Sequence, residues 1–229
     1  MMKLFYSFLL FIFLFVFFSC SKKDENNQLS IQLETYFDLT PGKFIIYDVI
    51  EVSHDETATV QHDTVYYQMK TLIGDTIIDN EGRIARKLIR YKRNNSQENW
   101  NPTDVWTCLI EGNRAEMIEE NQRIVKLMFP LSLNTKWNAN VFNSESANNC
   151  FYKNLHIPMQ INSIQFDSTL IVEQENQRNL IEYKRKFEVY ANGVGLIKKY
   201  FKDLKISNFD TLSVKSGKEF FLEVTDFGY

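Results

Sequence analysis

The chain has 229 residues, of which 44% are hydrophobic and 24% are charged, and its formal net charge is −3 at pH 7. This balance is typical of a chain that folds around a core, and it excludes a disordered tail, a collagen-like rod and a multi-span membrane protein. Acidic and basic residues are interspersed and create no field strong enough to hold phosphates. The composition therefore argues against a nucleic-acid partner.

The first nineteen residues have the pattern of a signal peptide. Lys3 is their one charge, and the run from Leu4 to Phe18 is almost wholly apolar. Such a run is too short to span a membrane comfortably as a permanent helix, but it suits a signal-peptide core. We therefore expect residues 1–19 to be removed; an uncleaved signal anchor and a simple secretory signal are the alternatives.

The residues around Cys20 indicate how the mature chain is held. Phe17-Phe18-Ser19-Cys20 resembles the lipobox of bacterial lipoproteins, although Phe17 stands where Leu is usual. The resemblance implies a diacylglycerol thioether on Cys20, cleavage between Ser19 and Cys20, and acylation of the new amine. Two or more acyl chains anchor a protein stably, because each buried methylene contributes about 0.8 kcal/mol.

A polar segment follows Cys20, and we interpret residues 20–32 as a flexible tether. Within it, Lys23-Asp24-Glu25 resembles the surface-export signal of Bacteroidota lipoproteins. This resemblance implies an outer-membrane lipoprotein that is exposed on the cell surface. The alternative is a solvated tether that is polar and carries no signal.

The rest of the chain alternates between apolar and polar residues at the period of half-buried β-strands. In residues 65–73, Tyr67 and Met69 fall on one face, while Gln68 and Lys70 fall on the other. The apolar faces of three further runs are Trp106, Cys108 and Ile110; Val125, Leu127 and Phe129; and Ile181, Tyr183, Phe187 and Val189.

Turn-forming residues separate these runs. They are Asp79-Asn80-Glu81-Gly82, Asn94-Asn95-Ser96, Glu111-Gly112-Asn113, Asn192-Gly193 and Ser216-Gly217. We predict an all-β fold, with one antiparallel domain over residues 33–229 whose hairpin-connected strands form a curved sheet, half-barrel or sandwich, with at most one or two short helices. A helix over residues 114–129 remains an alternative, since Ala115, Ile118, Val125 and Phe129 also fit helical spacing.

Three segments resemble a family of uncharacterised Bacteroidota lipoproteins of similar length. Residues 36–47 resemble its opening Tyr-Phe-Pro-Leu…Gly…Trp…Tyr pattern, residues 125–138 its middle motif, and residues 190–198 its late Gly-Val-Gly-Leu segment. The departures are Asp38 in place of Pro, Ile45 in place of Trp, and Asn134 in place of Gly. The resemblance implies an envelope location and a β fold, but no activity. We interpret four aromatic residues of these segments as plugs of a β core, with ligand contact as the alternative: Tyr36, Phe37, Trp137 and Tyr190.

Catalytic and metal-binding patterns are missing from the chain. No Gly-x-Ser-x-Gly, Ser-x-x-Lys or Cys-Gly-Ser-Cys motif occurs, so we predict a protein that is not an enzyme and that uses no cofactor. His54 and His62 flank a predicted hairpin tip at residues 55–61, where they can meet; we interpret them as an exposed hairpin end rather than a metal site. The acidic stretch of residues 75–81 lacks the order of a calcium loop and is read as polar turns.

Cys108 and Cys150 are the thiols that remain after lipidation. An oxidising envelope permits a disulfide between them, which would close about forty residues and stabilise the fold by roughly 4 kcal/mol. Cys108 lies in an apolar alternating run that suits a buried free thiol equally well, so both alternatives stay open.

Basic residues gather in residues 83–93 and 184–186 and at Lys198, Lys199 and Lys202. A basic strip attracts anionic polysaccharide or lipid headgroups. Acidic residues are interleaved with the basic ones, at Glu182, Glu188 and Asp203. Cross-strand ion pairs on a solvated face therefore explain the pattern more economically.

The sequence as a whole favours a non-catalytic cell-envelope lipoprotein whose β domain has a binding or structural role. The alternatives are a half-barrel carrier of a lipid or apolar ligand, a glycan-binding surface lipoprotein, and a polymer hydrolase with paired carboxylates. The expected partners are the membrane, through the lipid anchor, and a glycan, lipid or envelope protein.

Replacing the acyl acceptor tests the anchor. We expect metabolic labelling with palmitate to tag the wild-type chain and a Cys108→Ala control, and to leave Cys20→Ala untagged, because Cys20 is the thiol that directly follows Ser19. A Cys20→Ala chain that is labelled as strongly as its parent would contradict the anchor.

Overall fold

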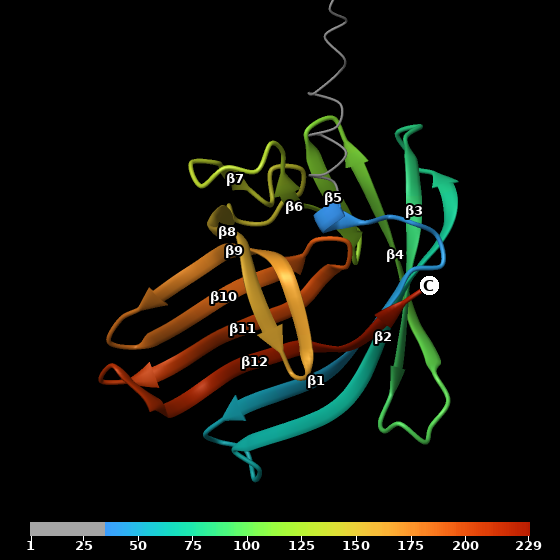
Figure 1. The fold of residues 1–229 in the computed structure, drawn as a ribbon. Coiled ribbons are helices and arrows are strands. Elements are labelled where there is room, and N and C mark those ends of the chain that lie inside the picture. The colour runs from blue at the N-terminus through green and yellow to red at the C-terminus, as the bar shows by residue number, and fades with distance from the viewer. Residues whose placement is uncertain (1–34) are drawn as a thin grey trace, which may run out of the picture. The chain divides into compact units, whose positions relative to one another are not determined.

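The alternating runs of the sequence form twelve β-strands in the computed structural model, which describes residues 35–229 (Figure 1). The strands are β1 (Phe44–Asp55), β2 (His62–Ile78), β3 (Ile84–Arg93), β4 (Asn101–Glu111), β5 (Arg114–Glu119), β6 (Gln122–Met128), β7 (Lys136–Asn138), β8 (Asn149–Ile161), β9 (Ile164–Arg178), β10 (Glu182–Ala191), β11 (Gly195–Ser207) and β12 (Asp210–Gly228). The helical content of the described residues is one 3-10 turn, η1 (Thr35–Phe37). The predicted all-β class is confirmed. The alternative helix over residues 114–129 is wrong, because that stretch forms β5 and β6.

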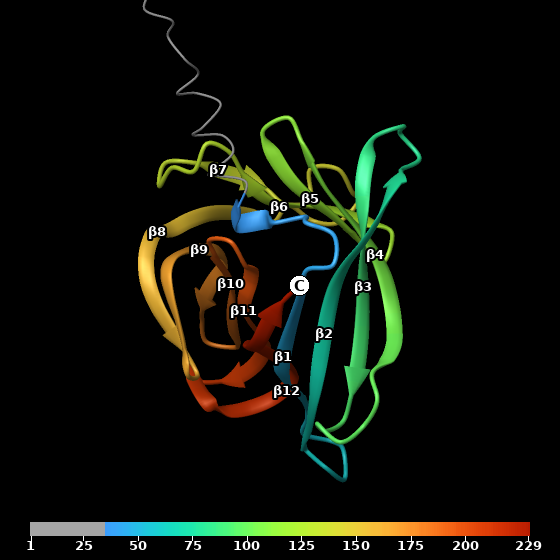
Figure 2. The same ribbon diagram turned by 45° about the vertical axis from the view of Figure 1, so that its right-hand side comes forward.

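All twelve strands belong to one sheet, and each is antiparallel to its neighbours. The order is β6-β5-β4-β3-β2-β1-β12-β11-β10-β9-β8-β7, so the first and last strands of the chain pair in the middle of the sheet. The two edge strands approach each other where the backbone N–H of Val125 donates to the carbonyl of Ala139 at 2.9 Å and Trp137 Nε1 donates to the carbonyl of Val125 at 3.0 Å. The sheet is therefore a nearly closed barrel (Figures 1 and 2), which confirms the curved-sheet prediction.

The β8–β9 hairpin bends back across β10–β12, as both views show (Figures 1 and 2). At its tip Asn162 has a positive φ of 53°, a conformation that Asn tolerates better than most residues. The Asn162 side-chain amide donates to the carbonyl of Val224 in β12 at 2.9 Å. This contact fixes the hairpin over the C-terminal strands.

The apolar faces pack into two core clusters. One includes Leu127, Trp137, Tyr152, Leu170 and Tyr190, and lies where β6 and β7 meet. The other includes Tyr47, Met69, Phe166, Ile197 and Leu222. Each large apolar side chain that is fully buried stabilises the fold by roughly 1.5–3 kcal/mol.

Four of the five predicted turns are confirmed, since residues 79–82, 94–96, 111–113 and 192–193 lie at connections between successive strands. The prediction of a turn at Ser216-Gly217 is wrong, because Gly217 lies inside β12 and pairs with both β1 and β11. Its φ is +133°, and an added Cβ would overlap the carbonyl oxygen of Asp203. Glycine is required there by the close approach of β11, and the sequence alone did not distinguish this need from a turn.

Several predictions concern residues 1–34 and lie outside the described residues: the signal peptide, the cleavage site Ser19-Cys20, the lipidated Cys20 and the export signal Lys23-Asp24-Glu25. Residues 33–229 form one compact unit. No helix in the part of the chain that the structure describes has the length and apolarity needed to cross a membrane.

The close approach of β11 to Gly217 can be tested by comparing Gly217 with Gly112. Both glycines have a positive φ, but Gly112 is surrounded by open space. We expect Gly217→Ala to lower the free energy of unfolding by about 3 kcal/mol or more, because strain and overlap act together. Gly112→Ala carries the backbone cost alone, about 1–2 kcal/mol. Urea denaturation measures both, and equal losses would contradict the close approach of β11.

Candidate functional site

A cavity of about 120 Å³ lies inside the curled sheet, between the two core clusters. Its apolar walls come from strands on both sides of the sheet centre and include Ile45, Met69, Leu88, Met117, Leu196 and Leu222. Phe37 of η1 and Leu39 just after it also line the cavity. Residues from distant parts of the chain therefore build one apolar chamber.

The size of the cavity limits what it can hold. Engineered apolar cavities of about 150 Å³ bind benzene, whereas sites for drug-sized ligands occupy roughly 300–1,000 Å³. The cavity thus has room for a single ring or a short aliphatic chain. A larger ligand would have to leave part of itself outside the pocket.

A cluster of buried charges forms part of the cavity lining. Glu188 of β10 is 1% exposed and Lys126 of β6 is 7% exposed. Lys126 Nζ lies 2.8 Å from Glu188 Oε1 and 3.3 Å from Glu119 Oε1. The hydroxyl of Tyr190 donates to Glu188 Oε2 at 2.6 Å, and Lys199 Nζ lies 3.7 Å from Glu188 Oε1. Each of these charges therefore has an opposite partner.

The ammonium groups keep both carboxyls ionised. Burial by itself would raise the pKa of Glu188, but the charges of Lys126 and Lys199 and the hydrogen bonds from Lys126 and Tyr190 outweigh it and lower that pKa to about 2. The pKa of Glu119 is also lowered, because Lys126 and Lys199 outweigh its burial. The pKa of Lys126 is raised, since its two carboxylate neighbours overcome desolvation.

Arg90 of β3 also lines the cavity, and its guanidinium lies over a neighbouring ring. Its guanidinium carbon lies 3.9 Å from the centroid of Trp106. Arg90 Nη1 lies 3.1 Å from Asp104 Oδ2, and Nη2 donates to the sulfur of Met69 at 2.9 Å. Arg90 Nε is buried and has no hydrogen-bond partner.

The segment between η1 and β1 is fastened beside the same cavity. Lys43 is 3% exposed, and its Nζ lies 2.6 Å from Asp38 Oδ2 and donates to the carbonyl of Gly193. Asp38 is one of the residues that depart from the family pattern, and here it neutralises a buried lysine. The bond to Gly193 ties the segment to the β10–β11 turn.

The four predicted aromatic plugs are all buried: Tyr36, Phe37, Trp137 and Tyr190. The Tyr36 hydroxyl lies 2.7 Å from Ser168 Oγ and 3.0 Å from His156 Nδ1, which joins η1 to β8 and β9. Phe37 and Tyr190 line the cavity as well. The predicted core role therefore describes all four residues, and contact with a ligand stays a prediction.

The histidines do not gather into one site. His54 and His62 meet across the β1–β2 hairpin, with 2.8 Å between their Nδ1 atoms, and His54 Nε2 lies 3.0 Å from Glu219 Oε1. Asp79, from the acidic stretch 75–81, binds Arg83. Over residues 35–229, no group of three or more His, Cys, Asp or Glu side chains is placed to hold a metal ion.

Cys108 and Cys150 are both free and buried, so the disulfide alternative is absent from the structure and the free-thiol alternative describes it. Each thiol donates to a separate backbone carbonyl at 3.6 Å, Cys108 to Arg86 and Cys150 to Asn148. Burial raises the pKa of both thiols to about 12. At neutral pH both are therefore protonated and unreactive.

The basic residues of the C-terminal strands form ion pairs, as the interleaved charges predicted. Lys186 pairs with Glu175 and Asp203, and Lys202 pairs with Glu219. The placement of Glu188 on a solvated face is wrong, because the curl of the sheet turns that side chain into the barrel interior. The alternating pattern of β10 does not show that Glu188 is buried, because its burial depends on the closure of the whole sheet.

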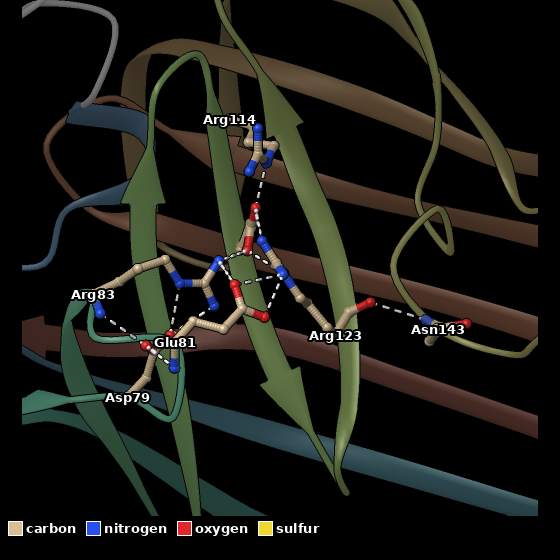
Figure 3. A network of polar contacts seen from close by, with 7 residues as sticks. Asp79, Glu81, Arg83, Arg114, Arg123 and Asn143 are labelled. Atoms are coloured by element: carbon tan, nitrogen blue, oxygen red, sulfur yellow. Dashed lines mark hydrogen bonds and ion pairs between the residues drawn. The ribbon is translucent and has the colours of Figure 1, made fainter.

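A second charged cluster lies on the other face of β5 (Figure 3). Met117 lines the cavity, so its neighbour Glu116 points to the opposite face. Glu116 is fully buried; it binds Arg114, lies 2.6 Å from Arg123 Nε and 3.4 Å from Arg83 Nη1. Burial would raise its pKa, but Arg123 and Arg114 outweigh burial and lower it. The cluster ties the β2–β3 turn to β5 and β6, and we interpret it as structural.

A row of aromatic side chains bears on the glycan alternative. Phe187 and Tyr200 stack with 5.0 Å between centroids and 11° between planes, and Tyr200 meets Phe221 edge to face at 5.0 Å. Arg185 lies over Phe187, and Lys202 lies over Tyr200 and Phe221. Tyr200 and Phe221 also line a second pocket of about 350 Å³, together with Asp48 and Glu223. Glycan binding at this row stays a prediction.

No family model matches the chain, and no curated protein matches it significantly. One solved structure that matches is described as a "putative lipoprotein" from Parabacteroides distasonis ATCC 8503, with 11% identity and a TM-score of 0.37 over 83% of this chain and 98% of that chain. This neighbour comes from the Bacteroidota, as does the family that the sequence resembles. At this identity and TM-score the likeness supports no conclusion about function.

Removing Lys126 tests the buried ion cluster. We expect Lys126→Met to lower the free energy of unfolding at pH 7 by about 3–5 kcal/mol, because two buried carboxylates lose their shared partner. Lys198→Met is the matched control; it removes a partly exposed pair with Glu223 and should cost less than about 1 kcal/mol. Urea denaturation of both variants provides the comparison.

The free energy of unfolding should also depend on pH differently in the wild type and in Lys126→Met. In the wild type, the folded pKa of Glu188 is below the unfolded value of about 4.3, so its stabilisation is complete above pH ~4.3 and is lost as the pH falls toward 2. In Lys126→Met, burial acts with less opposition and favours the protonated carboxyl. We expect that variant to regain stability between pH 7 and pH 5, and parallel pH profiles would contradict the cluster.

Proposed function

We propose that this protein is a non-catalytic lipoprotein of the outer membrane, exposed on the cell surface, whose curled sheet binds a small apolar molecule. The anchor and the location rest on the resemblance of the residues around Cys20 and Lys23 to lipoprotein signals. The binding role rests on the cavity inside the described domain. Among the alternatives from the sequence, this function is closest to the carrier, but its ligand is smaller than a lipid.

The observation that carries the binding role is a partly open, apolar-walled pocket inside the curled sheet. Protein cores pack about as densely as organic crystals and hold few voids larger than a water molecule. In a partly open pocket of about 120 Å³, the apolar lining atoms lack protein packing partners on one side. A small apolar ligand would restore those contacts, which supports binding there.

The chemistry of the cavity supports binding over hydrolysis. A glycosidase needs a carboxyl with a raised pKa to act as the general acid. Glu119 and Glu188 share Lys126 as a partner, and the pKa of each is lowered. Neither carboxyl holds a proton to donate near neutral pH.

Binding to the cavity can be tested with small uncharged probes. We expect benzene and 1-hexanol to shift the NMR signals of residues that line the cavity, with saturable binding. Leu88→Phe fills part of the cavity and should weaken binding at least tenfold. Val105→Phe is the matched control, since Val105 lies on the neighbouring strand and is 62% exposed.

The variants are first compared by circular dichroism, so that a loss of binding is separated from a loss of fold. Neither probe shifting the lining residues of the wild type would contradict the proposed function. Equal binding by folded Leu88→Phe and Val105→Phe would place the ligand elsewhere and contradict the cavity as the site.

A further inference from the structure

We infer that the cavity is built for a small apolar acid, whose carboxylate binds Arg90 and whose chain or ring fills the apolar space. This inference rests on the proposed function and adds the chemical class of the ligand. It starts from the hydrogen bonds of one guanidinium group. Among the described residues, Arg90 Nε and Glu173 Oε2 are the buried side-chain nitrogen and oxygen atoms without a hydrogen-bond partner.

The Arg90 donor without a hydrogen-bond partner, Nε, lies on the edge of the guanidinium that binds a carboxylate best. Nε and Nη2 share one edge, and on that edge Nη2 donates to the sulfur of Met69 while Nε has no acceptor. A thioether is a weak acceptor. A carboxylate accepts two parallel hydrogen bonds from such an edge, a geometry that adds both strength and specificity.

Arg90 and Met69 both line the cavity, so an acid in the cavity lies beside the pair that forms this edge. Trp106 stacks on the guanidinium and fixes its plane. The ion-pair partner of Arg90 is Asp104, whose side chain is 36% exposed and lies at Nη1 on another edge. The arginine is therefore positioned and partly desolvated. Its Nε is covered and Met69 occupies Nη2, so a carboxylate takes this edge by displacing the Met69 sulfur.

The other cations of the lining are already engaged. Lys126 is shared by Glu119 and Glu188, and Lys43 is held by Asp38 and the Gly193 carbonyl. Lys199 lies 3.7 Å from Glu188 Oε1. A cationic ligand would meet Arg90 without a free carboxylate to offset it. The charges thus favour an acid over an amine.

The cavity volume then sets the size of the acid. A space near that of a benzene-binding cavity suits a chain of about six carbons or one ring. Hexanoate is the test ligand, and 1-hexanol and hexylamine are its matched neutral and cationic counterparts. All three have the same chain, so they differ in the head group alone.

The experiment is an NMR titration of the full domain with the three compounds at pH 7. We expect wild type to bind hexanoate at least tenfold more tightly than 1-hexanol, and hexylamine the most weakly. Arg90→Gln should remove the preference for hexanoate over 1-hexanol, and Arg93→Gln should keep it. Arg93→Gln is the matched control, because Arg93 lies on the same strand and stacks on Trp100 but does not line the cavity.

The outcomes distinguish a failure of the acid as the ligand from a failure of the proposed binding site. Equal affinities of wild type for hexanoate and 1-hexanol would overturn the acid and leave the apolar site standing. No binding of any of the three would overturn both. The wild-type comparison needs no variant, so it decides the question even where Arg90→Gln fails to fold. Arg90→Lys keeps the charge and loses the forked edge, and full hexanoate preference in that variant would contradict the two-bond geometry.

Discussion

The ion pair between Lys126 and Glu188 is the interaction on which the interior of the domain depends. These residues lie on β6 and β10, the first and the ninth strands in the order of the sheet. Their side chains can meet at 2.8 Å only because the sheet curls until its distant strands face each other. Once the sheet is closed, a buried carboxylate without a partner is costly, so the closed interior depends on the pair staying intact. The edge contacts of Val125 with Ala139 and Trp137 then complete the closure.

The cavity follows from the same closure. Apolar side chains from both core clusters surround it, and the ionic cluster and Arg90 occupy part of its lining. Charged groups that must keep their partners cannot repack freely to fill a neighbouring void. A chamber with apolar walls and fixed charges is the result, and it has the combination of features that small-molecule sites use for affinity and orientation.

Local signals in the sequence predicted much of this fold. Alternation at a period of two marked the strands, and residues such as Asn192-Gly193 marked the turns, because both patterns depend on neighbours in the chain. Gly217 misled the prediction because its reason is the approach of β11, a contact that local sequence does not encode. The helix alternative for residues 114–129 was mistaken for a similar cause, since short paired strands can match helical spacing by chance.

The candidate site was the least predictable part. Glu188 and Lys126 belong to polar faces that look solvated in an alternating pattern, and nothing local distinguishes a polar face inside a barrel from one outside. Arg90 was one of several basic residues in the run 83–93, and its special feature is a buried Nε without a partner, which only the packed structure shows. The aromatic residues Phe37 and Tyr190 were the closest signal, because they were singled out as plugs and do line the cavity.

The most direct test of this account is a crystal structure of the domain soaked with hexanoate. The account predicts a six-carbon chain inside the barrel between Met69 and Leu222, with its carboxylate against Arg90 Nε and Nη2. An interior filled by repacked side chains, or by water with the acid bound elsewhere, would contradict it.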